Sequence, residues 1–108
     1  MHLGLIVETK DPGAVWNGFH LGNSALEAGH DVTAYLLGEG VEAPDQPAGD
    51  DVNPHGIIRK FQMDGGELLA CARCLDHRDM ASDDLRPRAE MARLVELIET
   101  ADETVSIG

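Results

Sequence analysis

The chain has 108 residues, which is the size of one domain, and we expect a single domain over residues 1–108. Its 20 acidic residues outnumber its 8 basic ones and give a formal charge of −12. Nucleic acids and anionic membranes are therefore poor partners, because binding to phosphate groups needs a basic surface. The chain holds only two Phe, one Trp and one Tyr, so its core must be mainly aliphatic.

The first third of the chain has the pattern of a strand, a helix and a second strand. Residues 3–7 form a continuous apolar run, which is typical of a strand buried on both faces of a parallel sheet. Residues 12–28 show helical spacing of apolar side chains, with Asp11 as the cap and Gly29 as the end. Residues 31–37 are rich in apolar and β-branched side chains, so this order predicts a parallel crossover.

The middle of the chain predicts two loops, a helix and a third strand. We expect a plain loop over residues 38–40 and a surface loop over residues 42–51 with nothing that could anchor a core. Asn53-Pro54 caps a helix that runs to about Met63, and residues 67–70 form the third strand.

The last third predicts a short helix over residues 72–78, a long amphipathic helix and a final strand over residues 104–107. The apolar stripe of the long helix is expected to comprise Leu85, Met91, Leu94, Val95 and Ile98. The alternation of strands and helices predicts an α/β fold with three α/β/α layers and a mainly parallel sheet of four or five strands. Sites in such folds form beyond the carboxyl ends of the strands.

Both cysteines follow the third predicted strand, where Cys71 and Cys74 are three residues apart. Backbone N–H groups at the start of the next helix, together with Arg73, His77 and Arg78, could stabilise a thiolate at Cys71. Such a close pair is not the spread disulfide framework of a secreted protein, so we expect a reducing cytoplasm. The apolar run at residues 3–7 is too short for a signal peptide or a membrane span.

Several kinds of chemistry fit this cysteine pair. Cys71, Cys74 and His77 have spacings that zinc tolerates, with His55 or a partner subunit as a fourth ligand, but no second ligand pair follows in the chain. A thioredoxin-like oxidoreductase would use the same Cys-x-x-Cys spacing. Two inert cysteines in an assembly module are the remaining alternative. We predict no cofactor and no resident metal.

Residues 65–78 carry a Gly-Gly, a short strand and then Ala-Cys-x-x-Cys-Leu-x-x-Arg. This order resembles the DsrE/DsrF-like family of small sulfur-relay proteins. The resemblance implies a flavodoxin-like fold, a homotrimer or homohexamer, and a cysteine that carries sulfur as a persulfide between donor and acceptor proteins.

In the family, the carrier cysteine lies directly after the third strand, at the position of Cys71 here, whereas a cysteine at the position of Cys74 occurs in only some members. We expect Cys71 to accept sulfur and Cys74 to release it by closing a disulfide. Whether the protein is an enzyme stays open, and sulfurtransferase is the activity it would have.

Overall fold

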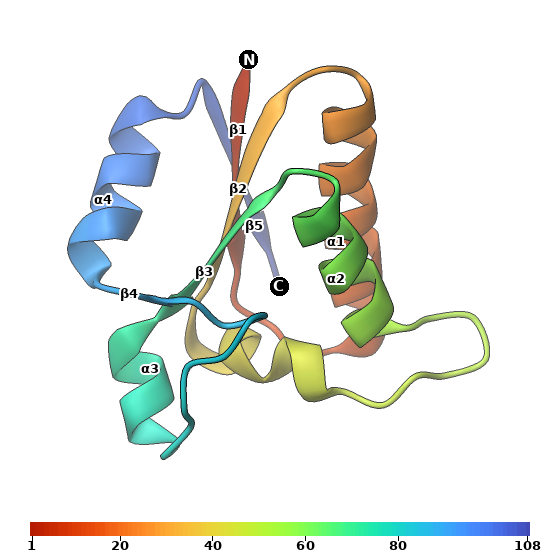
Figure 1. Cartoon of the computed structure of the whole chain (residues 1–108), viewed down its shortest axis with the longest axis vertical. Coiled ribbons are helices and arrows are strands. Elements are labelled where there is room, and N and C mark those ends of the chain that lie inside the picture. Colours follow the sequence, from red (N-terminus) through yellow and green to blue (C-terminus); the bar gives the residue numbers. More distant parts are fainter.

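A computed structural model describes residues 1–108. Its centre is a five-stranded sheet in the order β4-β3-β2-β1-β5, and all strand pairs are parallel. The strands are β1 (His2–Val7), β2 (Asp31–Leu36), β3 (Glu67–Cys71), β4 (Arg88–Ala89) and β5 (Glu103–Ile107), and the helices are α1 (Pro12–Glu27), the 3-10 helix η1 (Gly38–Asp45), α2 (Pro54–Met63), α3 (Ala72–His77) and α4 (Met91–Thr100). Helices α1 and α2 cover one side of the sheet and α4 covers the other (Figure 1). The predicted three-layer α/β fold is confirmed.

The predicted N-terminal caps of helices α1 and α2 are also confirmed. The Asp11 carboxylate accepts a hydrogen bond from the backbone N–H of Ala14 at 2.9 Å, and the Asn53 side chain accepts one from Gly56 at 3.0 Å. Each cap satisfies a backbone donor that the first helical turn leaves free. Both helices start at the edge of the sheet where the parallel strands end (Figure 1). No helix of the structure combines the length and apolar character that a membrane crossing requires.

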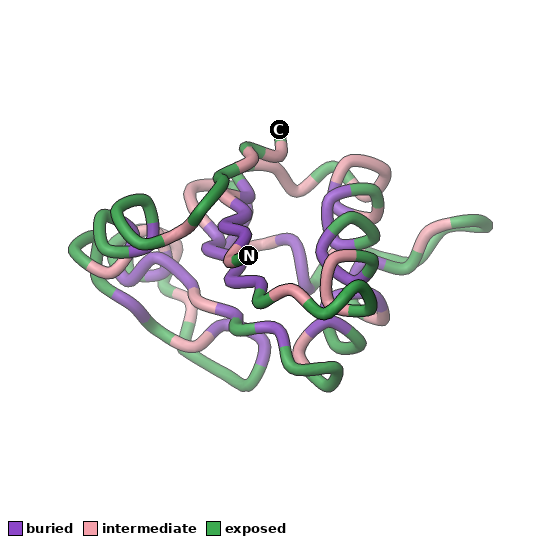
Figure 2. Tube along the Cα trace, turned by 90° about the horizontal axis from the view of Figure 1, so that it is seen from above, coloured by how far each residue is buried: buried purple, intermediate pink, exposed green.

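The two faces of the sheet differ in chemistry because successive strand residues point to opposite sides. On the side towards α1 and α2, the residues of the three central strands are aliphatic and buried; they comprise Leu3, Leu5, Val7, Val32, Ala34, Leu36, Leu68 and Ala70. The side towards α4 includes Thr33, Tyr35 and Cys71. Figure 2 shows the buried residues concentrated along the central strands and on the inner sides of the helices.

The prediction that the last helix includes Leu85 is wrong. Residues Arg88 and Ala89 form strand β4, and α4 begins only at Met91. Pro87 lacks a backbone N–H and restricts the residue before it to extended conformations, which opposes a helix at this point. The Pro87 carbonyl instead accepts a hydrogen bond from the N–H of Ala70 at 2.8 Å, so this segment extends the sheet beside β3.

The predicted apolar stripe of this helix is only partly right. Leu94 is buried as expected, and Leu97 is fully buried although its place in the pattern is marginal. In contrast, Met91, Val95 and Ile98 are 48 %, 51 % and 52 % exposed. Helix α4 packs on the sheet alone, mainly over β1, and no helix lies beside it to cover its flank. Met91, Val95 and Ile98, which lie on the flank of α4 away from the sheet, are therefore left facing solvent.

The expectation of a plain loop after β2 is also wrong, because η1 extends to Asp45 and buries Val41, Ala43 and Pro44 in the core. Gly40 fixes this helix against the end of β1. A Cβ atom at position 40 would lie 1.9 Å from the carbonyl oxygen of Val7, so only glycine allows this approach.

Candidate functional site

The two cysteines lie at the carboxyl edge of the sheet, where β3 passes directly into α3. Cys71 is the last residue of β3 and the N-cap of α3, and its Sγ accepts a hydrogen bond from the backbone N–H of Cys74 at 3.4 Å. Residues three apart share one face of a helix start, so the two side chains lie together. Both cysteines are free thiols. This dithiol, Cys71 and Cys74, is the chemically reactive feature of the edge.

Cys71 lies on the inner side of the dithiol and is only 2 % exposed. Strand β4 pairs beside it through Ala89. Tyr35 lies on the same face of the sheet, because it pairs with Leu69 and Cys71 follows two residues later. The Tyr35 hydroxyl donates to the carbonyl oxygens of Ala89 at 3.2 Å and Glu90 at 2.9 Å. Burial, and after it the neighbouring Cys71, raises the pKa of this hydroxyl.

The sequence analysis missed Tyr35 as a neighbour of Cys71. The available signal was the alternation within residues 31–36, in which Thr33 and Tyr35 share one face of the strand. The strand was predicted from its apolar and β-branched content alone, which does not distinguish its two faces.

Cys74 lies on the outer side of the dithiol and is partly exposed. Its Sγ accepts a hydrogen bond at 3.2 Å from the backbone N–H of Gly38, the first residue of η1. Burial raises the pKa of the Cys74 thiol, and the adjacent Cys71 raises it further, whereas the Gly38 N–H and the charge of Arg78 act in the opposite direction. The net effect is upward, because burial and Cys71 outweigh the Gly38 N–H and Arg78.

Of the predicted supporting residues, Arg78 lies beside the dithiol. Its guanidinium donates to the Cys74 carbonyl oxygen at 3.2 Å and to the Glu42 carboxylate at 3.0 Å. Lys10 lies 3.5 Å from the same carboxylate. Arg78, more than Lys10, holds the pKa of Glu42 below its usual range. Glu42, which the sequence analysis left in a loop, therefore connects η1 to α3 and balances the charge of Arg78.

Arg73 and His77 are exposed on α3 and make no side-chain hydrogen bond or ion pair within the chain. The structure thus separates the three predicted supporting residues. Arg78 contacts the Cys74 backbone, and the other two lie on the solvent side of the helix. Within the chain, no three His, Cys, Asp or Glu side chains gather as metal ligands would.

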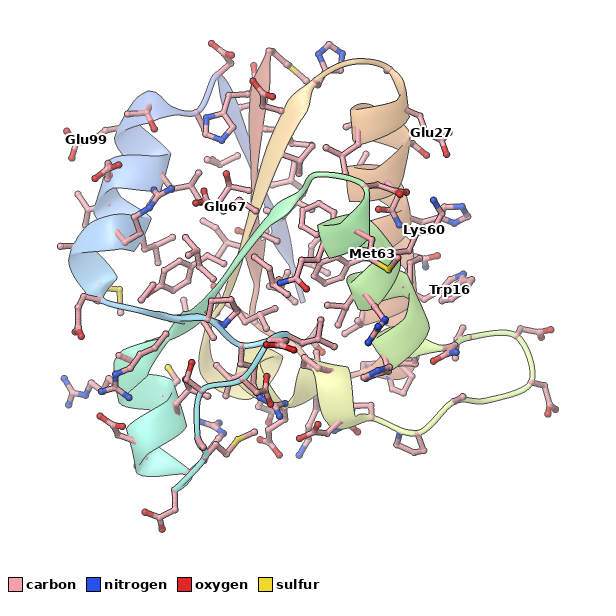
Figure 3. All side chains as sticks on the ribbon, viewed as in Figure 1. Trp16, Glu27, Lys60, Met63, Glu67 and Glu99 are labelled. Atoms are coloured by element: carbon pink, nitrogen blue, oxygen red, sulfur yellow. The ribbon has the colours of Figure 1, made fainter.

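The hollows of the structure lie away from the dithiol. One of about 330 Å³ opens between α1 and α2, and Trp16 and Lys60 on its wall lie across the molecule from α3 (Figure 3). The other, of about 320 Å³, lies between η1, the start of α2 and the segment before β4. Neither cysteine lines these hollows, and of the dithiol only Cys74 is partly exposed at the surface.

The comparisons with known proteins agree with this geometry. A model of the DsrE/DsrF-like family matches residues 1–107. The crystal structure of the YchN protein from E. coli superposes with a TM-score of 0.84 at 19 % identity, and the match covers 99 % of this chain and 100 % of that one. That likeness shows the fold. No curated protein sequence matches the chain. Because the family model spans nearly every residue, the chain belongs to the DsrE/DsrF-like family.

Proposed function

We propose that this protein relays sulfur by holding it as a persulfide on the dithiol of Cys71 and Cys74. Membership of the DsrE/DsrF-like family supports a sulfur-relay role in general. The observation that carries the proposal is the pairing of two free thiols at the carboxyl edge, where the N–H of Cys74 reaches the Sγ of Cys71 at 3.4 Å. A thiolate accepts the outer sulfur of a persulfide and is attacked in turn by the next thiol.

The partial exposure of Cys74 supports protein partners as the donor and acceptor of sulfur. A persulfide is short-lived in water, and its direct transfer between proteins needs a thiol that a second surface can reach. Cys74 is partly exposed and lies outside both hollows of the structure. Family members generally act in sulfur relay with partner proteins. The reaction would be a sulfurtransferase activity if turnover is catalytic.

The test is the intact mass of the full chain before and after exposure to glutathione persulfide, followed by a reductant. We expect the mass of one added sulfur atom, which the reductant removes. The double variant Cys71→Ser, Cys74→Ser is the control and should gain nothing. The single variants Cys71→Ser and Cys74→Ser cannot close the intramolecular disulfide, so they retain any sulfur that they accept. If neither variant gains sulfur while the wild type loses the mass of two hydrogens, the pair works as a thiol–disulfide oxidoreductase and the relay proposal is wrong.

We also propose that the protein assembles as a homotrimer or homohexamer. The support is the row of half-exposed side chains Met91, Val95 and Ile98 along the outer side of α4, which we call the α4 stripe. These positions are four and three residues apart, so they form one continuous apolar surface. Burying them against another copy would remove apolar area from water at about 25 cal/mol per Å².

We place the protein in the cytoplasm as a further part of the proposal. The support is chemical, because a dithiol that works through free thiolates requires a compartment that keeps thiols reduced. Both cysteines are free in the structure. Trapping the thiols in intact cells with a membrane-permeant alkylating reagent would test this, and a fully oxidised pair would contradict it.

A further inference from the structure

The two thiols of the dithiol differ in how an incoming molecule can reach them. Cys71 is 2 % exposed, whereas Cys74 is partly exposed. These values describe a single chain, and association with other chains can only cover more surface. We propose that Cys74, and not Cys71, first takes sulfur from the donor, and that Cys71 acts second, from the inner side. This order rests on the proposed sulfur relay and reverses the order expected from the family resemblance.

The enclosure of Cys71 comes from structure that surrounds it on several sides. Strand β4 pairs alongside it through Ala89, and the Tyr35 hydroxyl closes the inner side while hydrogen-bonded to the carbonyl oxygens of Ala89 and Glu90. Helix α3 starts directly from it. A displacement at sulfur requires the reacting atoms to approach to about 3–3.5 Å. A persulfide carried by another molecule cannot come so near Cys71 without local opening of β4 or α3.

Cys74 offers the groups that such a displacement needs. The backbone N–H of Gly38 points at its Sγ from 3.2 Å, and Arg78 is held beside it through the Cys74 carbonyl oxygen. An N–H donor and a guanidinium charge both stabilise a thiolate as it forms. Gly38 belongs to η1, which Gly40 fixes against β1, so this donor is rigidly placed.

Transfer of sulfur to Cys74 exchanges one S–S bond for another. The Cys74 thiol first loses its proton to solvent, and the Gly38 N–H and Arg78 stabilise the thiolate that forms. This thiolate attacks the outer sulfur of a donor persulfide, R–S–SH; a new S–S bond forms, the donor S–S bond breaks, and the donor leaves as a thiolate that takes up a proton. An acceptor thiolate can then attack the outer sulfur and regenerate Cys74. Alternatively, the Cys71 thiolate attacks the inner sulfur of Cys74, which closes the Cys71–Cys74 disulfide and releases hydrosulfide. In that branch, two electrons pass from the thiols to the transferred sulfur, and an external dithiol reductant must reopen the disulfide.

The test compares Cys71→Ser with Cys74→Ser in the full chain, with glutathione persulfide as the donor and intact mass as the readout. We expect Cys71→Ser to gain one sulfur atom at the wild-type rate. Cys74→Ser should gain it about tenfold more slowly or not at all, because reaction at Cys71 requires a local opening. If Cys74→Ser reacts at the wild-type rate and Cys71→Ser does not, the proposed order is overturned while the relay stands. If neither variant gains sulfur, the relay itself fails, because neither variant can lose accepted sulfur by closing the disulfide.

A second measurement needs no variant and is independent of any effect of serine on folding. The native wild type is treated briefly with iodoacetamide and then digested with trypsin, which cuts after Arg73 and places the two cysteines on separate peptides. We expect alkylated Cys74 to accumulate well before alkylated Cys71. Equal or faster labelling of Cys71 would overturn the order. Labelling in denaturant, where both thiols are open, serves as the reference for intrinsic reactivity.

Discussion

The two faces of the central sheet are built from the same strands but have different chemistry. On the side of α1 and α2, every residue of the three central strands β1, β2 and β3 is aliphatic. The rings of Phe19 and Phe61 pack edge to face above them, with their centroids 5.3 Å apart. On the side of α4, Thr33 donates to Glu67 at 3.1 Å and bonds His2 at 2.9 Å, and Arg93 donates to Glu67 at 2.7 Å. Tyr35 and the dithiol continue this polar face towards the carboxyl edge.

The difference indicates how the chain divides stability and chemistry. The aliphatic face buries side chains that interdigitate closely, which is where most of the folding free energy arises. The polar face has one covering helix, α4, whose outer stripe stays half exposed. At its amino end the polar groups satisfy one another, and at its carboxyl end a thiol remains within reach of solvent. Function is therefore expected where this face leaves groups open.

The largest expected effect on the free energy of unfolding comes from a substitution on the aliphatic face. Phe61→Ala should destabilise the fold by about 3–5 kcal/mol, because it removes a fully buried ring that packs on Phe19 and over Gly66. Urea denaturation measures this loss. The matched change Ile98→Ala, at a half-exposed position of α4, should cost the monomer less than about 1 kcal/mol. Similar losses for both would contradict the division.

Tyr35→Phe tests the polar face directly. The change removes the hydroxyl donor from the carbonyl oxygens of Ala89 and Glu90, of which that of Glu90 keeps another donor, the N–H of Arg93. The cost is expected to be about 1–3 kcal/mol. Because these carbonyls join β4 to α4, hydrogen exchange should accelerate there more than in α1. Cys71 should become more accessible to alkylation. Unchanged exchange at β4 would mean that the hydroxyl does not hold this junction.

Val95→Asp tests whether the outer side of α4 is an assembly surface. A charge in the α4 stripe should dissociate the proposed homo-oligomer, because an unpaired carboxylate is costly to bury. Light scattering gives the mass, and circular dichroism should stay native because Val95 is half exposed. Met63→Asp, at an exposed apolar residue on the opposite layer, is the control and should leave the mass unchanged. A monomeric wild type would refute the assembly.

The smallest expected effect concerns the charge balance at the dithiol. In the wild type, the rate of Cys74 alkylation should keep rising above pH 9.0, the ordinary pKa of a thiol, because burial favours the protonated form. Glu42→Gln leaves Arg78 without its counter-charge, so Cys74 should react a few-fold faster at neutral pH. Arg78→Met should slow the reaction. Arg73→Met, which alters an unpaired exposed side chain, should change little.

Much of this architecture could be predicted from the sequence, and the failures have physical reasons. The caps at Asp11 and Asn53 and the position of Cys71 at a strand end were predictable because local hydrogen bonding and apolar periodicity determine them. Strand β4 was not, since two residues carry no periodic signal. The burial of Cys71 was missed for the same reason, because β4 supplies part of its cover.

The approach of Gly40 to the Val7 carbonyl has a consequence for engineering and for divergence of this chain. The Gly38 N–H that donates to the Cys74 Sγ is positioned by backbone contact between η1 and β1. Because the contact is between backbone atoms, no side chain can adjust if the two elements shift. Lengthening the turn after β2 by even one residue would carry that donor out of register with the sulfur. The exposed segment at residues 47–51, which lies beyond η1 and before the cap of α2, can absorb insertions without moving it.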